Sequence, residues 1–279
     1  MLTLAKGKKT NHVICVAKNA PVTEKNAAAE LAAYLKKITG ATFPITESFV
    51  RKRQVIAVGP GAAMGIGALK NPPTGLGDEG TIRLTMGDNL VLCGAEGAAR
   101  GTLYAVYSFL EEELGCRWWT PKAEFVPSCR DLNLPSLDKR FVPVLEYREP
   151  HYHNAFDQKW AVRNRTNAFI GLTDAWGGGR VYEGFCHTFE SLVPPDPFFK
   201  AHPEWFSEVD GKRTCEKAQL CLTNPELTAF VIAELKQRLR RNPRATHASV
   251  SQNDWGGNCQ CARCRALDRK EGGPAGSLI

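Results

Sequence analysis

The sequence has no long hydrophobic run. None of its apolar stretches approaches the ~20 consecutive residues that a membrane-spanning helix requires, so a helix that crosses a bilayer is not expected. Residues 1–5 are followed at once by Lys6, Lys8 and Lys9, which leaves no apolar segment of the kind found in a signal peptide. The N-terminal residues therefore do not indicate a cellular location.

Neither basic nor acidic residues are concentrated in one part of the sequence. The 279 residues include 36 Lys and Arg against 29 Asp and Glu, a net charge of +7, and 43% of the residues are hydrophobic. This balance is typical of an ordinary globular protein. The densest basic stretch, residues 236–244, is typical of a solvated helix end, and the other basic residues are scattered. We therefore expect no nucleic-acid partner.

A phosphate-binding loop is missing as well. Residues 94–100 contain glycine and precede a predicted helix, but they lack the ordered glycines and the Lys-Ser/Thr pair of a P-loop. The helix that follows, residues 102–114, is amphipathic, with leucine, valine and tyrosine on one face. The pattern favours packing over nucleotide binding.

Cysteine is abundant, but it is not arranged as a compact disulfide framework. The ten cysteines are spread along the chain. Cys15 and Cys93 lie in apolar strand patterns, where cysteine usually behaves as a small buried hydrophobe. The cysteine pattern therefore leaves the redox compartment open.

Three late cysteines have a more suggestive spacing. Cys259, Cys261 and Cys264 offer three sulfur ligands on one short segment, and structural zinc takes four nitrogen or sulfur ligands in a tetrahedron. The spacing does not fix the fourth ligand, for which the candidates are Cys186, Cys215, Cys221 and a histidine. These cysteines form a candidate structural zinc site, with a disulfide or free thiols as the alternatives.

The first half of the chain predicts a small α/β domain, residues 1–125, with a mixed sheet and helices. Strands are expected at residues 13–17, 54–59, 80–86 and 89–94, the last two as a hairpin. A helix with Ala27, Leu31, Leu35 and Ile38 on one face is expected between Thr23 as N-cap and Gly40 as C-cap. Residues 126–144, punctuated by three prolines, are expected to be a linker.

The second half, residues 145–279, alternates strand and helix patterns and predicts a parallel βα array. Strands are expected at residues 145–149, 167–172 and 219–223 and from Ala248 onward, with helices through Trp160 and from Pro225. A closed barrel needs about 250 residues and eight strands. We therefore expect the first half of a TIM-like (β/α) barrel, apparently truncated, in an N-terminal fragment.

Polar and aromatic residues follow the last predicted strand. Asn253, Asp254 and Trp255 come directly after it, and Gly256 and Gly257 mark a turn. Parallel βα arrays bind ligands at the carboxyl ends of their strands, so these side chains are candidates for ligand contacts. The alternative is a loop whose Asp and Asn only satisfy backbone donors.

The first half also resembles a known domain. Residues 23–45, which include Ala27-Ala-Ala-Glu-Leu31, are similar to the N-terminal domain of alpha-glucuronidases and beta-hexosaminidases. Residues 94–107 and Leu114-Gly-Cys-Arg-Trp-Trp119 continue this resemblance.

The second half resembles a bacterial domain of unknown function, DUF4838. The matching stretches are Phe185-Cys-His-Thr-Phe189, His202-Pro-Glu-Trp-Phe206, Gln219-Leu-Cys-Leu-Thr-Asn-Pro225, Ser251-Gln-Asn-Asp-Trp255 and Cys259-Gln-Cys-Ala-Arg-Cys264. The two resemblances together imply a glycoside-hydrolase-like protein that acts on a carbohydrate and needs no cofactor for catalysis. They also suggest a secreted or periplasmic protein.

Glycosidic bond cleavage usually needs two carboxyl groups. The resemblance places the general acid at Asp254, with Glu149 or a residue beyond the chain as its partner. Hexosaminidases carry an Asp-Glu pair at this position, and Asn253-Asp254 replaces it here, which argues against substrate-assisted catalysis on an acetamido sugar. The expected substrate-binding residues are Arg148, His151, Trp176, His187, Asn253 and Trp255. The alternatives are a non-catalytic carbohydrate-binding protein and, more distantly, a zinc-ribbon-like interaction module.

Overall fold

The computed structural model describes residues 1–48, 53–167, 171–274 and 276. The chain divides into two compact units, Met1–Gly179 and Arg180–Ile279, and each is described by itself. Among the described residues, no helix combines the length and the apolar character needed to cross a membrane.

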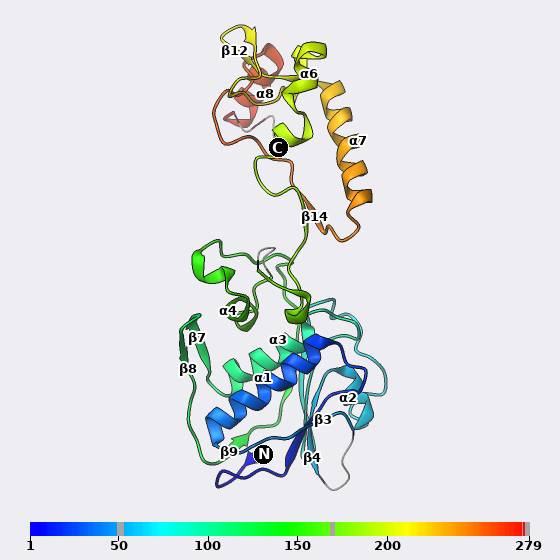
Figure 1. Cartoon of the computed structure of the whole chain (residues 1–279), viewed down its shortest axis with the longest axis vertical. Coiled ribbons are helices and arrows are strands. Elements are labelled where there is room, and N and C mark those ends of the chain that lie inside the picture. The colour runs from blue at the N-terminus through cyan, green and yellow to red at the C-terminus, as the bar shows by residue number, and fades with distance from the viewer. Residues whose placement is uncertain (49–52, 168–170, 275, 277–279) are drawn as a thin grey trace. The chain divides into compact units, whose positions relative to one another are not determined.

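The first unit is built on a six-stranded mixed sheet with the order β10-β5-β6-β4-β2-β3 (Figure 1). The strands of the unit are β1 (Leu2–Ala5), β2 (His12–Cys15), β3 (Ile45–Thr46), β4 (Gln54–Val58), β5 (Thr81–Met86), β6 (Asn89–Cys93), β7 (Arg117–Thr120), β8 (Ala123–Phe125), β9 (Leu132–Leu134) and β10 (Asp138–Phe141). Strands β3, β2, β4 and β6 are parallel, whereas β5 is antiparallel to both β6 and β10. The predicted strands and hairpin of the N-terminal domain are therefore confirmed.

Helices cover both faces of this sheet: α1 (Val22–Thr39), α3 (Gly101–Ser108) and the π-helix η1 (Phe109–Glu113) lie on one face, and α2 (Pro60–Gly65) lies on the other. The 3₁₀ turn η3 (Asp174–Trp176) packs on α1, α4 (Gln158–Arg163) packs on α3, and the 3₁₀ turn η2 (His153–Phe156) packs on α4. Figure 1 shows α1 and α3 on one side of the sheet and α2 on the other. Alternate residues of β4 point to opposite faces: Ile56 packs with α1 and α3, whereas Val55 packs with α2.

Helix α1 follows the predicted pattern except at its first turn. Its buried face includes Leu31 and Leu35, and Gly40 ends the helix in the left-handed conformation at φ 74°. The expected N-cap, Thr23, instead lies inside the helix, which begins after Pro21. Pro21 occupies the N-cap position in the extended conformation, and because its side chain has no acceptor, the helix begins without a side-chain cap.

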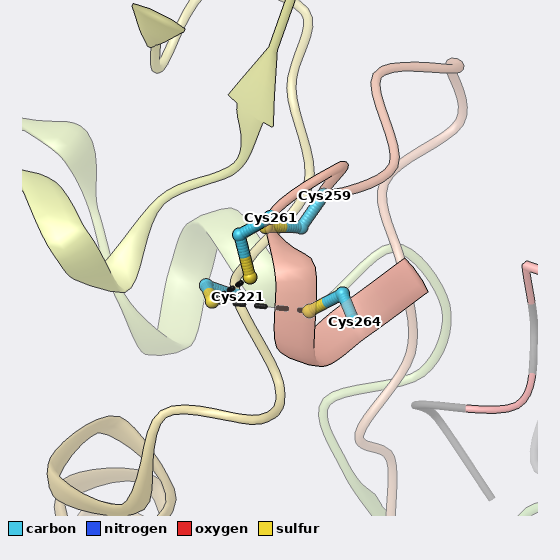
Figure 2. A group of neighbouring side chains, drawn as sticks. All are labelled: Cys221, Cys259, Cys261 and Cys264. Carbon is cyan, nitrogen blue, oxygen red and sulfur yellow. Dashed lines mark hydrogen bonds between the residues drawn. The ribbon is translucent and has the colours of Figure 1, made fainter. Parts of the chain in front are cut away.

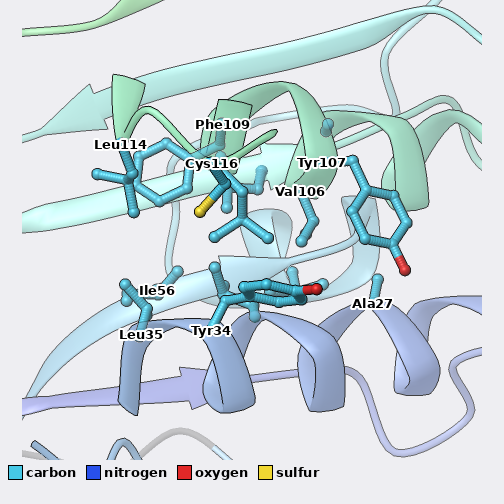
Figure 3. Packing of buried hydrophobic residues seen from close by; sticks show 14 of the residues in the cluster. Ala27, Tyr34, Leu35, Ile56, Val106, Tyr107, Phe109, Leu114 and Cys116 are labelled. Atoms are coloured by element: carbon cyan, nitrogen blue, oxygen red, sulfur yellow. The ribbon is translucent and has the colours of Figure 1, made fainter. Parts of the chain in front are cut away.

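Aromatic rings close the core between α1 and α3. The ring of Trp118 makes edge-on contacts with both Tyr34 and Tyr107, each at 5.6 Å between centroids. Figure 3 shows Tyr34 on α1 facing Val106 and Tyr107 on α3 across this core. The indole N–H of Trp118 donates to the Tyr34 hydroxyl at 2.8 Å, so the buried polar atoms are paired.

Residues 126–144, expected to be a linker, contribute two strands to the first unit. Strand β9 pairs with β1, and β10 pairs with β5 at the edge of the main sheet. This pairing binds the stretch to the N-terminal fold, and the division between the compact units lies further along the chain, after Gly179.

The strand expected at residues 145–149 is not formed. The main chain here is bonded by Asn167: its Oδ1 accepts from Arg148 N at 2.8 Å, its Nδ2 donates to the Glu146 carbonyl at 2.8 Å, and its main-chain N–H donates to the Arg148 carbonyl at 3.2 Å. One residue thus satisfies these main-chain groups, most of them through its side chain. The strand expected at residues 167–172 falls largely on residues 168–170, which lie outside the described residues.

The second unit contains short strands and several helices. They are β11 (Tyr182–Glu183), α5 (Phe189–Leu192), α6 (Pro195–Ala201), the 3₁₀ turn η4 (Pro203–Trp205), β12 (Glu208–Val209), β13 (Lys212–Arg213), α7 (Pro225–Arg241), β14 (His247–Ala248) and α8 (Ala262–Glu271). Strands β11 and β14 are parallel, and β12 and β13 form an antiparallel pair. The chain is thus mixed α/β in both units, as predicted.

The core of the second unit is small. Phe189, Trp205, Phe206, Leu220 and Leu227 form most of its buried apolar cluster. Helix α7, predicted from Pro225, is confirmed. The strand expected at residues 219–223 is reduced to a single bridge between Phe206 and Leu220, because the neighbouring main chain bonds to a loop instead.

Candidate functional site

The loop that carries the predicted ligand-binding residues is fixed by one buried glutamine. The Asn253 N–H donates to Gln219 Oε1 at 2.9 Å, and Gln219 Nε2 donates to the Asn253 carbonyl at 3.0 Å. The same amide also donates to the carbonyl of Trp255 at 2.6 Å. Asn253 is itself buried, and its Oδ1 accepts from the N–H of Glu190 in the first turn of α5 at 3.1 Å. The loop is therefore bonded from two sides.

Asp254 and Trp255 are exposed on this fixed main chain. The Trp255 side chain is 39% exposed, and its indole N–H donates to the Ala218 carbonyl at 3.0 Å. This bond anchors one edge of the ring while part of it remains accessible. A cavity of about 140 Å³ lies beside it, lined by Phe189, Phe206 and Trp255 among others.

His187 lies next to the same loop. Its Nδ1 is 3.0 Å from the Gln252 carbonyl, and because a carbonyl only accepts, Nδ1 carries the proton of this hydrogen bond. The main chain here is held by bonds between Thr188 and Ser251: the N–H of Ser251 donates to Thr188 Oγ1 at 2.9 Å, and the Thr188 N–H donates to the Ser251 carbonyl at 3.0 Å. His187 has a φ of 55°, a conformation that is uncommon for a residue with a side chain.

The three late cysteines gather with a fourth, Cys221 (Figure 2). Cys259 and Cys261 precede α8, Cys264 lies in its first turn, and Cys221 comes from the segment before α7. All four side chains are buried and free, and their sulfur atoms lie within 4.8 Å of one another. The structure thus selects Cys221 from the candidates that the sequence left open.

Polar donors surround this cysteine cluster. The Glu208 N–H donates to Cys259 Sγ at 3.4 Å, and Arg213 Nη1 donates to the same sulfur at 3.6 Å. Hydrogen bonds from the Cys259 and Cys264 thiols lower the pKa of Cys221. Burial lowers the pKa of Arg213, but its hydrogen bond to Cys221 and the nearby sulfur atoms raise it overall. These neighbours favour the thiolate form at Cys221, whereas the hydrogen bond to Cys221 raises the pKa of Cys264.

The first unit holds a second group of predicted residues. Arg148 donates from Nη2 to Glu79 Oε2 at 2.6 Å, and Arg100 donates from Nε to Glu79 Oε1 at 2.7 Å. The Glu149 side chain is only 4% exposed; it accepts a hydrogen bond from the Tyr147 hydroxyl and lies 3.5 Å from His151 Nδ1. Arg148 and Glu149 are therefore engaged in contacts within the protein.

Trp176 packs against the hydrophobic core of the first unit, and the ammonium of Lys159 lies 5.8 Å from its ring centroid. The 3₁₀ turn that ends in Trp176 is attached to α1, because Asn26 Nδ2 donates to the Ala175 carbonyl at 2.7 Å. These contacts favour a packing role for the ring.

The predicted site residues thus fall into two groups. The second unit brings together His187, Asn253, Asp254, Trp255, Cys259, Cys261 and Cys264, and the first unit holds Arg148, Glu149, His151 and Trp176. Sequence reasoning missed the anchoring role of Gln219 and the proximity of Arg213 to the cysteines. Gln219 is the first residue of the stretch 219–225 that resembles DUF4838, and this resemblance could have indicated its importance. Nothing in the sequence spacing of Arg213 indicates that it lies near the cysteines.

Comparisons with known proteins bear on the family. The model of a family described as a domain of unknown function (DUF4838) matches residues 118–279, more than half of the chain. No curated protein matches the sequence. Among solved structures, a family GH115 4-O-methyl-alpha-glucuronidase with specificity for decorated arabinogalactans aligns over 100% of this chain, with a TM-score of 0.48 and 13% identity. The chain spans 41% of that structure's length, and a similarity at this level carries no inference about activity.

Proposed function

Because the chain belongs to the DUF4838 family, whose description assigns no activity, we propose a function from the site itself: the chain is a carbohydrate-active, glycoside-hydrolase-like protein. Its ligand is a glycan that binds at the loop of residues 251–258. The observation that carries this proposal is the presentation of Asp254 and Trp255, two exposed side chains, on a main chain that Gln219 holds fixed.

The chemistry of these two side chains suits a sugar. An indole offers a broad apolar face on which the C–H groups of a pyranose ring can stack. A carboxylate accepts hydrogen bonds from hydroxyl groups, and when protonated it can serve as the general acid of glycosidic cleavage. The cavity of about 140 Å³ beside Trp255 has room for a substituent of a sugar ring rather than for a whole oligosaccharide.

His187 adds a third polar group to the proposed glycan site. With its Nδ1 donating to the Gln252 carbonyl, the imidazole can use Nε2 for a hydrogen bond with a sugar hydroxyl. The main-chain bonds between Thr188 and Ser251 place His187 next to the loop.

For hydrolysis, we keep Glu149 as a proposed catalytic carboxylate. It lies in the first unit, and its side chain is 4% exposed. Arg148, His151 and Trp176 are proposed substrate-binding residues of the first unit, and for Trp176 the packing role that its contacts favour is the competing interpretation.

The architecture that we propose for the second unit is the first part of a (β/α) barrel. The support is the parallel pairing of β11 with β14, with helix α7 in the connection between them, because a parallel strand pair with a helical crossover is the repeating unit of such barrels. The polar loop follows β14 at its carboxyl end, where barrel enzymes carry their ligand-binding groups.

A non-catalytic carbohydrate-binding protein is the second candidate. The burial of Glu149 favours this candidate, because a catalytic carboxylate must reach the substrate. Binding without catalysis requires only that a sugar stacks on Trp255.

Retention on a panel of immobilised glycans that includes uronic-acid and acetamido sugars tests the proposal. We expect the chain to be retained by at least one glycan and Trp255→Ala to lose that retention. The control is Trp119→Ala, which removes a side chain that is 62% exposed in the first unit. A chain that no glycan retains, or equal retention of both variants, contradicts a glycan site at this loop.

A further inference from the structure

The sulfur atoms of the cysteine cluster lie within 4.8 Å of one another, and two of their separations match the edge of one metal tetrahedron. With a Zn–S bond of about 2.3 Å, a regular tetrahedron has edges of about 3.8 Å. Cys221 Sγ lies 3.7 Å from Cys261 Sγ and 3.9 Å from Cys264 Sγ (Figure 2). A disulfide would bring two sulfur atoms to about 2.05 Å. The spacing therefore matches shared coordination and does not match a covalent bond between any drawn pair.

From this geometry we propose that Cys221, Cys259, Cys261 and Cys264 bind one structural Zn²⁺ ion. Four thiolates fill all four positions of tetrahedral zinc and leave none for water, so the ion does not act as a Lewis acid on a substrate. The proposal is independent of the carbohydrate function, because it uses none of the residues that would contact a glycan.

The surroundings compensate the charge of such a centre. Zinc with four thiolates carries a net charge of −2, which burial makes costly unless donors are near. Arg213 supplies a positive charge 3.6 Å from Cys259 Sγ, and the Glu208 N–H lies 3.4 Å from the same atom. The Thr223 hydroxyl lies 3.2 Å from Cys264 Sγ and can donate to it. Donors of this kind orient and stabilise metal-bound sulfur.

The place of the cluster in the fold explains what the metal would do. Its four cysteines form a separate buried cluster beside the small apolar core of the second unit. The ion would join the segment before α7 to the segment that leads from the 251–258 loop into α8. In the part of the chain that the structure describes, no regular strand pairing joins these two segments. Small domains with limited cores commonly rely on a metal in this way.

Elemental analysis tests the proposal directly. Protein purified without chelator from zinc-supplemented cells should contain about one zinc per chain, the stoichiometry of a single tetrahedral site. Cys221→Ser should lose the zinc, whereas Cys186→Ser, which changes an exposed cysteine of the same unit, should retain it. Iron in place of zinc, or equal zinc content in the two variants, would overturn the assignment.

A second measurement covers the case in which Cys221→Ser does not fold. The wild-type chain and Cys186→Ser are stripped of metal under reducing conditions and titrated with Co²⁺. Tetrahedral coordination by four thiolates gives strong visible d–d and sulfur-to-metal absorption that saturates at about one equivalent. Weak absorption typical of octahedral Co²⁺, or a disulfide between two of the four cysteines in the purified protein, contradicts the site.

Discussion

The side-chain amide of Gln219 forms hydrogen bonds with both the main-chain N–H and the main-chain carbonyl of Asn253. Oε1 accepts from the Asn253 N–H at 2.9 Å, and Nε2 donates to the Asn253 carbonyl at 3.0 Å. A neighbouring β-strand would supply the same pair of bonds, so one side chain takes the place of a strand at the residue that precedes Asp254.

Gln219→Leu should therefore loosen the loop and destabilise the second unit. The substitution leaves buried groups of Asn253 without partners, at a cost of about 1–3 kcal/mol for each group. We expect faster hydrogen exchange at residues 253–256 and a lower midpoint of urea unfolding. Gln252→Leu, which changes an exposed side chain in the same loop, is the control. Equal exchange in the two variants would show that Gln219 does not hold the loop.

Glu79 should stabilise the first unit at neutral pH. Burial raises its pKa, but hydrogen bonds from Asn167 and Arg148 and the charge of Arg100 lower it overall, below the ordinary value of 4.5. Because the pKa is lower in the folded state, the stabilisation is present above the unfolded pKa and is lost as the pH falls through the folded pKa.

Glu79→Gln should accordingly cost about 3 kcal/mol of unfolding free energy at neutral pH, since it removes the buried carboxylate of the Arg100 guanidinium and leaves only the longer contact with the exposed Asp78. The difference from wild type should narrow below the ordinary pKa of 4.5. Glu47→Gln, at an exposed ion pair with Lys25, is the control and should have little effect. A penalty for Glu79→Gln that does not change with pH would contradict the role of its charge.

Glu24 should show the opposite pH dependence. Burial, with a smaller contribution from the negative charge of Glu96, raises its pKa from 4.5 to about 7. The folded state thus favours the protonated form, and stability that is present below pH 4.5 is lost as the pH rises through about 7.

Glu24→Gln removes this titration and should raise the unfolding midpoint at mildly alkaline pH, with little effect in acid. Urea unfolding of the wild type and of Glu24→Gln across the pH range measures this difference in midpoint. The amide also retains the shape that fits against Gly59, where an added Cβ would meet Glu24 Oε2 at 2.2 Å. A variant that is less stable than wild type at every pH would show that the carboxyl group has another role.

The N-terminal sheet and helix α1 could be predicted because their information is local. The apolar stripe through Leu31 and Leu35 and the glycine after it specify a helix with one buried face, whatever the partner. The prediction of a strand at residues 145–149 was wrong because the structure there depends on a residue that is distant in sequence. Its alternating pattern cannot show that Asn167, distant in sequence, satisfies the main chain there instead of a neighbouring strand.

The cysteine cluster, too, could be predicted from the sequence only in part. The spacing of Cys259, Cys261 and Cys264 is local and pointed to a metal site, but the fourth member, Cys221, is brought near only by tertiary folding. The position of Arg213 next to Cys259 depends on the β12–β13 hairpin and leaves no trace in spacing.

Asp254→Asn separates the two proposed functions. If Asp254 is a general acid, hydrolysis of aryl glycosides should fall by at least ~10²-fold while glycan binding stays near wild type, because proton transfer occurs only in the transition state. The control is Asp210→Asn, which removes an exposed carboxylate elsewhere in the second unit. If the wild-type chain binds a glycan but hydrolyses none, the carbohydrate-binding alternative gains support.

The most direct test of the central claim, that a glycan binds at residues 251–258, is an NMR titration with D-glucuronic acid and N-acetyl-D-glucosamine. The indole N–H of Trp255, which donates to the Ala218 carbonyl at 3.0 Å, is a resolved reporter within the loop. We predict that its resonance and the amides of residues 253–256 shift with a saturating dependence on at least one sugar, while the indole of the exposed Trp119 does not move. Saturable shifts confined to other parts of the chain, or none with either sugar, would contradict the claim.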